Sequence, residues 1–188
     1  MDNNFTIEVV DEENIDSALN SEIKELLCGV FPDWSGIFRS RRQWHNIAPI
    51  FSVLGFNEAD TLIGHVAVVV RAITTTWNFR YHVASIQGVC VAEEHRKSGL
   101  AKRMLKTALK EAVKREFSFA ILYCKEPLVP FYMSQGWKLA EDNVVMRNEQ
   151  DLPVSMRSNC PMYCELGDET FPEGPMDVHN FPKPGGPP

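Results

Sequence analysis

At residues 89–101 the chain reads VCVAEEHRKSGLA. The part up to Val91 closes a segment rich in β-branched and aromatic residues, which favours a strand. A helical repeat of apolar residues starts at Leu100. Between the two lies the pattern Arg-x-x-Gly-x-Ala, from Arg96 to Ala101. The first N–H groups of a helix lack internal partners and lie at its positive end, so this junction predicts an anion-binding loop.

The chain before this junction reads as a strand, a helical region and a meander. Phe5–Val10 alternates apolar and polar residues and predicts a first strand. From Asn14, interpreted as an N-cap, apolar residues recur at helical spacing until Pro32 stops the helix. The stretch Trp34–Trp44 is compatible with a short second helix. Three strand-like segments follow, and they cover Ile50–Phe56, Thr61–Thr75 and Arg80–Val91.

The chain after the junction alternates helices and strands. The apolar face of the first predicted helix comprises Leu100, Met104, Ala108, Ala112 and Val113. Phe119–Cys124 is continuously apolar and predicts a buried, parallel strand. A short helix is expected over Pro127–Gln135, closed by Gly136. Further strands are expected from Trp137 and over Met162–Leu166.

This order of elements predicts one mixed α+β domain over residues 1–188. We expect a central, mostly antiparallel twisted sheet, a βαβ unit around the junction, and flanking helices. A chain of 188 residues is long enough to bury one core. Residues 171–188 are rich in Pro and Gly and are expected to form an extended or mobile C-terminal tail.

Charge is distributed unevenly along the chain. The formal net charge is −6, which argues against a nucleic-acid partner. Between Arg96 and Arg115, however, there are eight Lys or Arg residues and a single acid, Glu111. A concentrated basic segment in an acidic protein favours an anionic small molecule as its ligand.

The cysteine content and the apolar runs of the sequence bear on metal binding and on cellular location. The five cysteines include Cys160 and Cys164, but no second pair of Cys or His follows at zinc-site spacing, so we predict reduced thiols and no metal. The N-terminal residues contain no basic stretch leading into an apolar run, and apolar runs such as Val66–Val70 last only a few residues. We therefore predict a cytoplasmic protein with no membrane partner.

Two motifs together resemble the GNAT N-acetyltransferase superfamily. Its signature is Arg/Gln-x-x-Gly-x-Gly/Ala after a strand, matched here by Arg96–Ala101. A second family segment, Phe-Tyr-x-x-x-Gly-Phe/Trp, is similar to Phe131–Trp137. The resemblance covers Thr61–Trp137 well and implies a GNAT-like fold with acetyl-CoA as the acyl donor.

The resemblance also implies roles for individual residues. The pantetheine arm would run beside Val89, Cys90 and Val91, and one of their backbone N–H groups would polarise the acetyl carbonyl. The residues implied to hold the cofactor's phosphates are Arg96, Lys97, Ser98, Gly99, Leu100, Ala101 and Lys102. Tyr132 matches the family's general acid, which protonates the departing thiolate.

No general base is assigned from the sequence. Where family members carry Glu on the fourth strand, this chain has Ser85 and Gln87. His65 and His82 titrate in the right range, but the pattern favours an ordinary strand residue in each case. The family transfers the acetyl group directly, which disfavours an acetyl-enzyme at Cys90.

The acceptor is predicted to be a primary amine of a small molecule. The sequence features that bear on its charge disagree with one another. Phe171–Val178 loosely resembles a C-terminal segment of the branch with aminoglycoside 2'-N-acetyltransferases and nodulation N-acyltransferases. An acidic C-terminal region favours a cationic amine; its acids are Glu141, Asp142, Glu149, Asp151, Glu165, Asp168, Glu169, Glu173 and Asp177. The basic residues Arg39, Arg41 and Arg42 favour an anionic acceptor or CoA itself.

Three alternatives stay open at this point. The acceptor could be a protein N-terminus or lysine, which requires an open groove. The domain could instead be a non-catalytic CoA-binding sensor, in which the Tyr132 hydroxyl has no function. A longer acyl chain is compatible with the sequence, and a homodimer is suggested by analogy alone.

Overall fold

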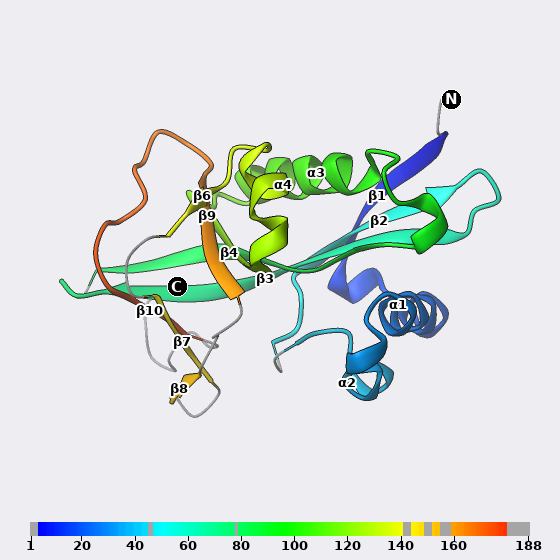
Figure 1. The fold of residues 1–188 in the computed structure, drawn as a ribbon, viewed down its shortest axis with the longest axis horizontal. Coiled ribbons are helices and arrows are strands. Elements are labelled where there is room, and N and C mark those ends of the chain that lie inside the picture. Colours follow the sequence, from blue (N-terminus) through cyan, green and yellow to red (C-terminus); the bar gives the residue numbers. More distant parts are fainter. Residues whose placement is uncertain are drawn as a thin grey trace. The chain divides into compact units, whose positions relative to one another are not determined.

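The computed structural model describes residues 4–44, 47–77, 79–140, 144–148, 152–154 and 159–179 (Figure 1). The backbone divides into two compact units. Unit 1 comprises residues 1–69 and 86–111, and unit 2 comprises residues 70–85 and 112–188. Two long strands, β3 (Leu62–Thr75) and β4 (Arg80–Val91), contribute residues to both units.

The sheet of unit 1 is antiparallel. Strand β1 (Phe5–Asp11) pairs with β2 (Phe51–Asn57), and β2 pairs with the first part of β3. Directly after β4, the Ala92 N–H donates a hydrogen bond to the Ile63 carbonyl of β3 at 2.8 Å. These strands confirm the expected first strand and meander.

Helices α1 (Ser17–Val30) and α2 (Ser35–Ser40) lie on one face of this sheet (Figure 1). They follow two short 3₁₀ turns, Glu12–Asn14 and Pro32–Trp34. The predicted N-cap at Asn14 is wrong, because the first 3₁₀ turn delays the helix. The true N-cap is Asp16, whose carboxylate accepts from the Leu19 N–H at 2.8 Å.

Helix α3 (Leu100–Lys114) lies on the opposite face of the unit 1 strands (Figure 1). Gly55 and Gly64 are register partners on β2 and β3, and a Cβ at either would approach Leu100 or Met104 to within 3.0 Å. The glycine pair therefore lets α3 pack close to the sheet. Val113, which the sequence places on the apolar face of this helix, is 48% exposed.

Unit 2 contains the parallel strand predicted from its apolar run. Strand β5 (Phe119–Lys125) pairs in parallel with β4 through Ala84↔Ala120 and Ser85↔Ile121, which confirms the βαβ expectation. Its other edge pairs with β9 (Asn159–Glu165), which in turn pairs with β6 (Lys138–Leu139). A 3₁₀ turn, Glu126–Leu128, and helix α4 (Val129–Met133) follow β5.

The far side of unit 2 includes part of the predicted tail. Strand β10 (Met176–His179) pairs antiparallel with β3 and parallel with β7 (Val144–Arg147). Strand β8 (Pro153–Val154) pairs antiparallel with β7, and neither strand was predicted from the sequence. Phe171 is buried in the core of unit 2, and Met176–His179 within the predicted tail forms a strand. Residues 180–188 lie outside the described residues.

The fold class predicted from the sequence is confirmed. The strand pairs are mostly antiparallel, with β4–β5 and β7–β10 as the parallel pairs in the described residues. The helices flank the strands, and the connection from β4 to its parallel neighbour β5 runs through α3. This places the loop 96–101 at the end of β4 and at the beginning of α3, both in unit 1 for these residues.

Candidate functional site

The loop before α3 has an unusual backbone. Lys97 and Gly99 have φ values of 63° and 86°, in the left-handed region. Left-handed residues in a loop turn successive backbone N–H groups toward one concave side, which suits an anion. A Cβ on Gly99 would meet nothing within 4 Å, so glycine is favoured here by backbone conformation and not by packing.

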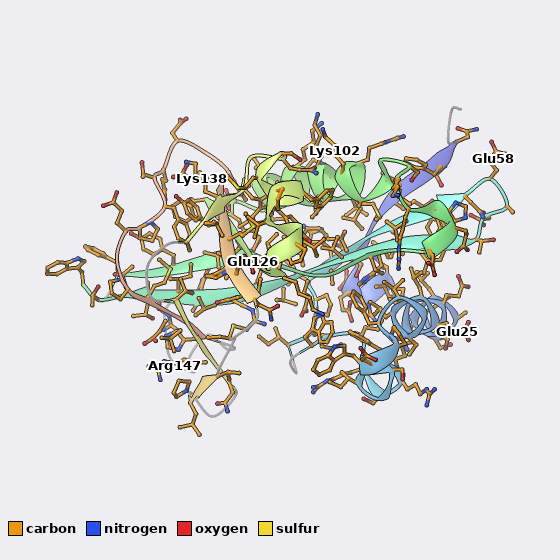
Figure 2. All side chains as sticks on the ribbon, in the orientation of Figure 1. Glu25, Glu58, Lys102, Glu126, Lys138 and Arg147 are labelled. Atoms are coloured by element: carbon orange, nitrogen blue, oxygen red, sulfur yellow. The ribbon has the colours of Figure 1, made fainter. Side chains whose placement is uncertain are left out.

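Side chains of the same loop have divided functions. Ser98 Oγ accepts a hydrogen bond from the Leu100 N–H at 3.3 Å and caps the helix. The Leu100 side chain is buried at 1% exposure. Lys97 and Lys102 are exposed, and Lys102 extends from the start of α3 (Figure 2). The loop therefore offers backbone N–H groups flanked by two solvent-facing cations.

Arg96 is the exception among the predicted phosphate ligands. Its Nε lies 3.5 Å from the Val91 carbonyl, so the side chain reaches back to the end of β4. Arg96 and Ser98 also line a cavity of about 410 Å³ whose other walls include Glu58, labelled in Figure 2, and Glu94. Two carboxylates make this cavity unsuited to a phosphate, so the N–H groups of the loop are the better candidate for contacting an anion.

The end of β4 presents its backbone in two directions. Along a strand, successive backbone N–H groups point to alternate edges. The Ala92 N–H points to β3, so the N–H groups of Val91 and Val89 point away from β3. The Val91 carbonyl, on that same side, is the one that Arg96 contacts. Val89 and Val91 are therefore the predicted residues whose N–H groups could reach an added extended ligand.

Gly88 interrupts β4 just before this segment, and His65 contacts it. Gly88 has a φ of 61° and is buried. His65 Nδ1 lies 3.0 Å from the Gly88 carbonyl, and Nε2 lies 3.4 Å from Ser52 Oγ. Burial, with a smaller contribution from the Arg42 charge, lowers the pKa of His65 to about 4. A neutral imidazole with both nitrogens engaged is poorly suited to act as a general base near neutral pH.

Cys90 is buried at 5% exposure beside the same cluster. Burial raises the pKa of its thiol to about 12. The reactive form of cysteine is the thiolate, so this environment agrees with the prediction that Cys90 is not acetylated during turnover.

Tyr132 lies on α4 in unit 2. It is 6% exposed, and its ring contacts those of Phe131 and Trp137 at centroid distances of 5.1 and 6.1 Å. Burial, together with the nearby Cys124 thiol, raises its pKa further above the usual range. The phenol therefore keeps its proton at neutral pH, as a proton donor requires.

The sequence model of the acetyltransferase (GNAT) domain matches residues 14–140. The chain belongs to the GNAT acetyltransferase family. This confirms the resemblance predicted from the Arg96–Ala101 and Phe131–Trp137 motifs, and it identifies the chain as an acyltransferase. The match to the aminoglycoside and nodulation branch stays a prediction.

Solved structures of this family share the fold at low sequence identity. ElaA from Escherichia coli is 16% identical, with a TM-score of 0.62 over 86% of this chain and 100% of ElaA. YhbS from Escherichia coli, solved in complex with CoA, is 16% identical, with a TM-score of 0.66 over 93% and 89%. A GNAT-family acetyltransferase from Staphylococcus aureus is 12% identical, with a TM-score of 0.56 over 86% and 100%. A search of curated proteins finds no similar sequence.

Several buried polar groups were not predicted from the sequence. Buried polar atoms without a hydrogen-bond partner among the described residues include Gln87 Nε2 in unit 1, and Tyr123 Oη and Trp137 Nε1 in unit 2. Tyr123 lies near the buried Arg71, whose Nε donates to Ser85 Oγ at 3.1 Å. Arg71, a charged residue within the apolar run of β3, was the one sequence signal for this cluster of Arg71, Ser85 and Tyr123.

The basic residues considered for an anionic acceptor differ in their surroundings. Arg42 is 6% exposed and bonded to Glu12 and Asn20, so it serves an internal ion pair. Arg41 donates to the Trp44 carbonyl, and Arg39 is exposed at the end of α2. Of the acidic residues, Glu141, Asp142, Glu149 and Asp151 lie outside the described residues.

Within the described residues, no group of three or more His, Cys, Asp or Glu side chains is arranged to hold a metal ion. Nor does any helix in the same residues have both the length and the hydrophobicity to cross a membrane.

Proposed function

We propose that this GNAT protein transfers the acetyl group of acetyl-CoA to a primary amine of a small molecule. The observation that carries the proposal is the left-handed backbone at Lys97 and Gly99 at the start of α3. In such a conformation, successive N–H groups can converge on an anion. Pyrophosphate is the anion that such a helix N-terminus binds well. The shared fold with YhbS, which was solved with CoA, supports CoA as the ligand.

The proposed cofactor contacts follow from the loop and from β4. Backbone N–H groups of Ser98, Gly99, Ala101 and Lys102 would bind the pyrophosphate, and the Lys97 and Lys102 ammonium groups would add charge. Arg96 and the Leu100 N–H would support the loop from within, given their bonds to Val91 and Ser98. The pantetheine arm would add to the edge of β4 at Val89–Val91 as an extended strand does.

The proposed reaction is direct attack in a ternary complex. The amine nitrogen attacks the thioester carbonyl, whose oxygen becomes an oxyanion stabilised by a backbone N–H at the end of β4; such a donor is worth about 3–4 kcal/mol. The C–S bond then breaks, Tyr132 gives its proton to the departing thiolate, and the amine nitrogen loses a proton. The products are an acetamide and CoA.

Deprotonation of the amine is proposed to occur without a carboxylate on β4. Gln87 occupies the corresponding position and is neutral at any pH. His65 is neutral and engaged on both nitrogens. The rate is therefore expected to rise with pH until the free amine itself is deprotonated, through water as the proton acceptor.

The remaining expectations are proposals of the same kind. We propose a single cytoplasmic N-acetyltransferase domain over residues 1–188, with no metal, nucleic-acid or membrane partner, and with homodimerisation open to test. The cationic amine, such as an aminosugar or polyamine, is preferred over an anionic acceptor, because Arg42 is bonded internally.

Thiol release from acetyl-CoA tests the proposal directly. The protein is assayed against aminoglycosides, polyamines, amino acids and short peptides, and CoA binding is followed separately by thermal shift. Robust release with one small-amine class is the expected result. Turnover with peptides alone would indicate protein acetylation, and CoA binding without turnover would indicate a sensor. If neither CoA nor acetyl-CoA shifts the melting temperature, the proposed function is wrong.

A further inference from the structure

The structure points to His65 as a positioning residue, and to the Val89 N–H as the donor that it aims at the acyl carbonyl. This inference rests on the proposed function, which places the acyl group beside Val89–Val91 without choosing among the three N–H groups. Ser52, His65 and residues 88–96 all belong to unit 1.

The Gly88 carbonyl is held by a side chain. Gly88 is buried and left-handed, with a φ of 61°, and a buried carbonyl requires a donor. His65 supplies it, with Nδ1 at 3.0 Å from the carbonyl oxygen. The contact is close, because a Cβ built on Gly88 would lie 3.2 Å from the imidazole Cε1. Glycine and histidine therefore fit each other at this site.

The bonds of His65 define its tautomer. A carbonyl oxygen can only accept, so Nδ1 carries the proton. Nε2 is then the acceptor, and the Ser52 hydroxyl, 3.4 Å away, donates to it. Ser52 and His65 are both fully buried, so water does not compete for these bonds. Ser52, His65 and Gly88 thus form a directed chain that ends on the backbone of β4.

The held carbonyl fixes the next N–H. The Gly88 carbonyl and the Val89 N–H belong to one planar trans peptide, in which the two groups point in opposite directions. Holding the carbonyl against His65 therefore points the Val89 N–H away from His65. The alternation counted back from Ala92 gives the same answer independently, since it points the Val89 N–H away from β3.

Val89 is distinguished from the other two candidates by these contacts. Cys90 has the opposite orientation in the alternation, toward β3. Val91 shares the orientation of Val89, but its carbonyl is contacted by Arg96 and its peptide leads into the phosphate loop. Val89 is the residue whose N–H direction is set by a buried side chain from another strand, which is the preorganisation an oxyanion donor requires.

The first experiment uses NMR amide shifts and needs no acceptor. The full-length protein is titrated with CoA and with acetonyl-CoA, a thioether analogue that retains a carbonyl but cannot transfer it. We expect the Val89 amide proton to move further downfield with acetonyl-CoA than with CoA. A downfield shift confined to Cys90 or Val91 would overturn the assignment. Ring ¹⁵N shifts of His65 should show the neutral Nδ1–H tautomer, and the opposite tautomer would overturn the argument.

The second experiment separates positioning from packing. His65→Asn keeps an N–H near the Nδ1 position, whereas His65→Phe keeps the ring volume and removes both hydrogen bonds. We expect His65→Phe to lower kcat by about 10²-fold, as displacement of a reacting group does, with the CoA dissociation constant within about threefold of wild type. His65→Asn should recover most of kcat. A folded His65→Phe protein with wild-type kcat, or an equal loss in both variants, would overturn the proposal.

Measurements on the wild-type protein distinguish failure of the His65 proposal from failure of the proposed function. If wild type neither binds CoA nor turns over any amine, the proposed function is wrong, and the acyl-positioning proposal is overturned with it. If wild type is active and the variants behave as in the overturning outcomes above, only the His65 proposal is wrong. Circular dichroism and thermal melts of each variant establish that it is folded before its kinetics are compared.

Discussion

Two left-handed glycines flank the end of β4, and they are held in opposite ways. Gly88 is buried, and a Cβ there would press on the His65 ring at 3.2 Å. Gly99 is exposed, and a Cβ there would meet nothing within 4 Å. The first glycine is required by both backbone and packing, and the second by backbone alone.

The difference matches two kinds of backbone recognition. At Gly99, the backbone is exposed, and the proposed ligand of its loop brings its own charge. At Gly88, the peptide is fixed from behind by a buried histidine before any ligand arrives. An anion site therefore needs few contacts with buried side chains. A single N–H donor that must point at one atom needs a side chain that fixes the orientation of its peptide.

Substitution of Gly88 by valine is expected to have the largest effect. Left-handed strain and overpacking against His65 together should lower the free energy of unfolding by about 4 kcal/mol. Urea denaturation followed by circular dichroism measures this loss. A loss below about 1 kcal/mol would mean that Gly88 does not pack against His65 as described.

Acidification should break the buried contact more gradually. The pKa of His65 is lowered to about 4 in the folded protein, from 6.5 when unfolded. Between these pH values the unfolded chain binds a proton that the folded chain does not, so stability falls as the pH drops. The loss from this one residue approaches about 3 kcal/mol near pH 4.

The matched measurement is the difference between wild type and His65→Asn. Both proteins carry the same carboxylates, so their stability curves share every other acidic titration. We expect the difference in unfolding free energy to shrink as the pH falls from 7 to 4. A difference that is constant across this range would show that His65 titrates normally.

Tyr132→Phe tests the other unit of the molecule. The substitution removes only the phenolic hydroxyl, so kcat is expected to fall by about 10²-fold, at the low end for a general acid because a thiolate leaves readily. The KM for acetyl-CoA and the melting temperature should be nearly unchanged. Steady-state thiol release measures both constants. An unchanged kcat would assign Tyr132 to the core alone, and would favour a sensor if wild type is also inactive.

The smallest effect is expected at the exposed glycine. Gly99→Val introduces left-handed strain where a Cβ meets nothing within 4 Å, so the free energy of unfolding should fall by only about 1–2 kcal/mol. This is the control for Gly88→Val, because the substitution is the same and only the surroundings differ. Equal losses at the two positions would remove the distinction between them.

The exposed loop was predictable from the sequence, and the buried contact was not. Arg96, Gly99 and Ala101 form a local pattern between a strand and a helix, and the conformation of such a loop depends on few other residues. His65 and Gly88 are 23 residues apart and meet only because β3 and β4 fold together. Nothing in the local sequence of either residue indicates the other.

The same distinction applies to the fold. Strands β2, β3 and β4 were predicted from β-branched residues, and α3 from its apolar face. Strand β10 was missed because its Pro- and Gly-rich surroundings resemble a tail, yet Met176 and Val178 are buried between β3 and β7. Pairing with distant strands stabilises that segment, and no local pattern encodes such pairing.

Calorimetric titration of CoA into wild type, Gly99→Ala and Gly99→Glu tests the central claim most directly. The two variants share the backbone strain, and only Gly99→Glu places a carboxylate beside the proposed pyrophosphate. We predict that wild type binds CoA, that Gly99→Ala binds within about tenfold, and that Gly99→Glu loses a further factor of about 30 or more. Equal affinity in the two variants, or no binding by wild type, would contradict the account.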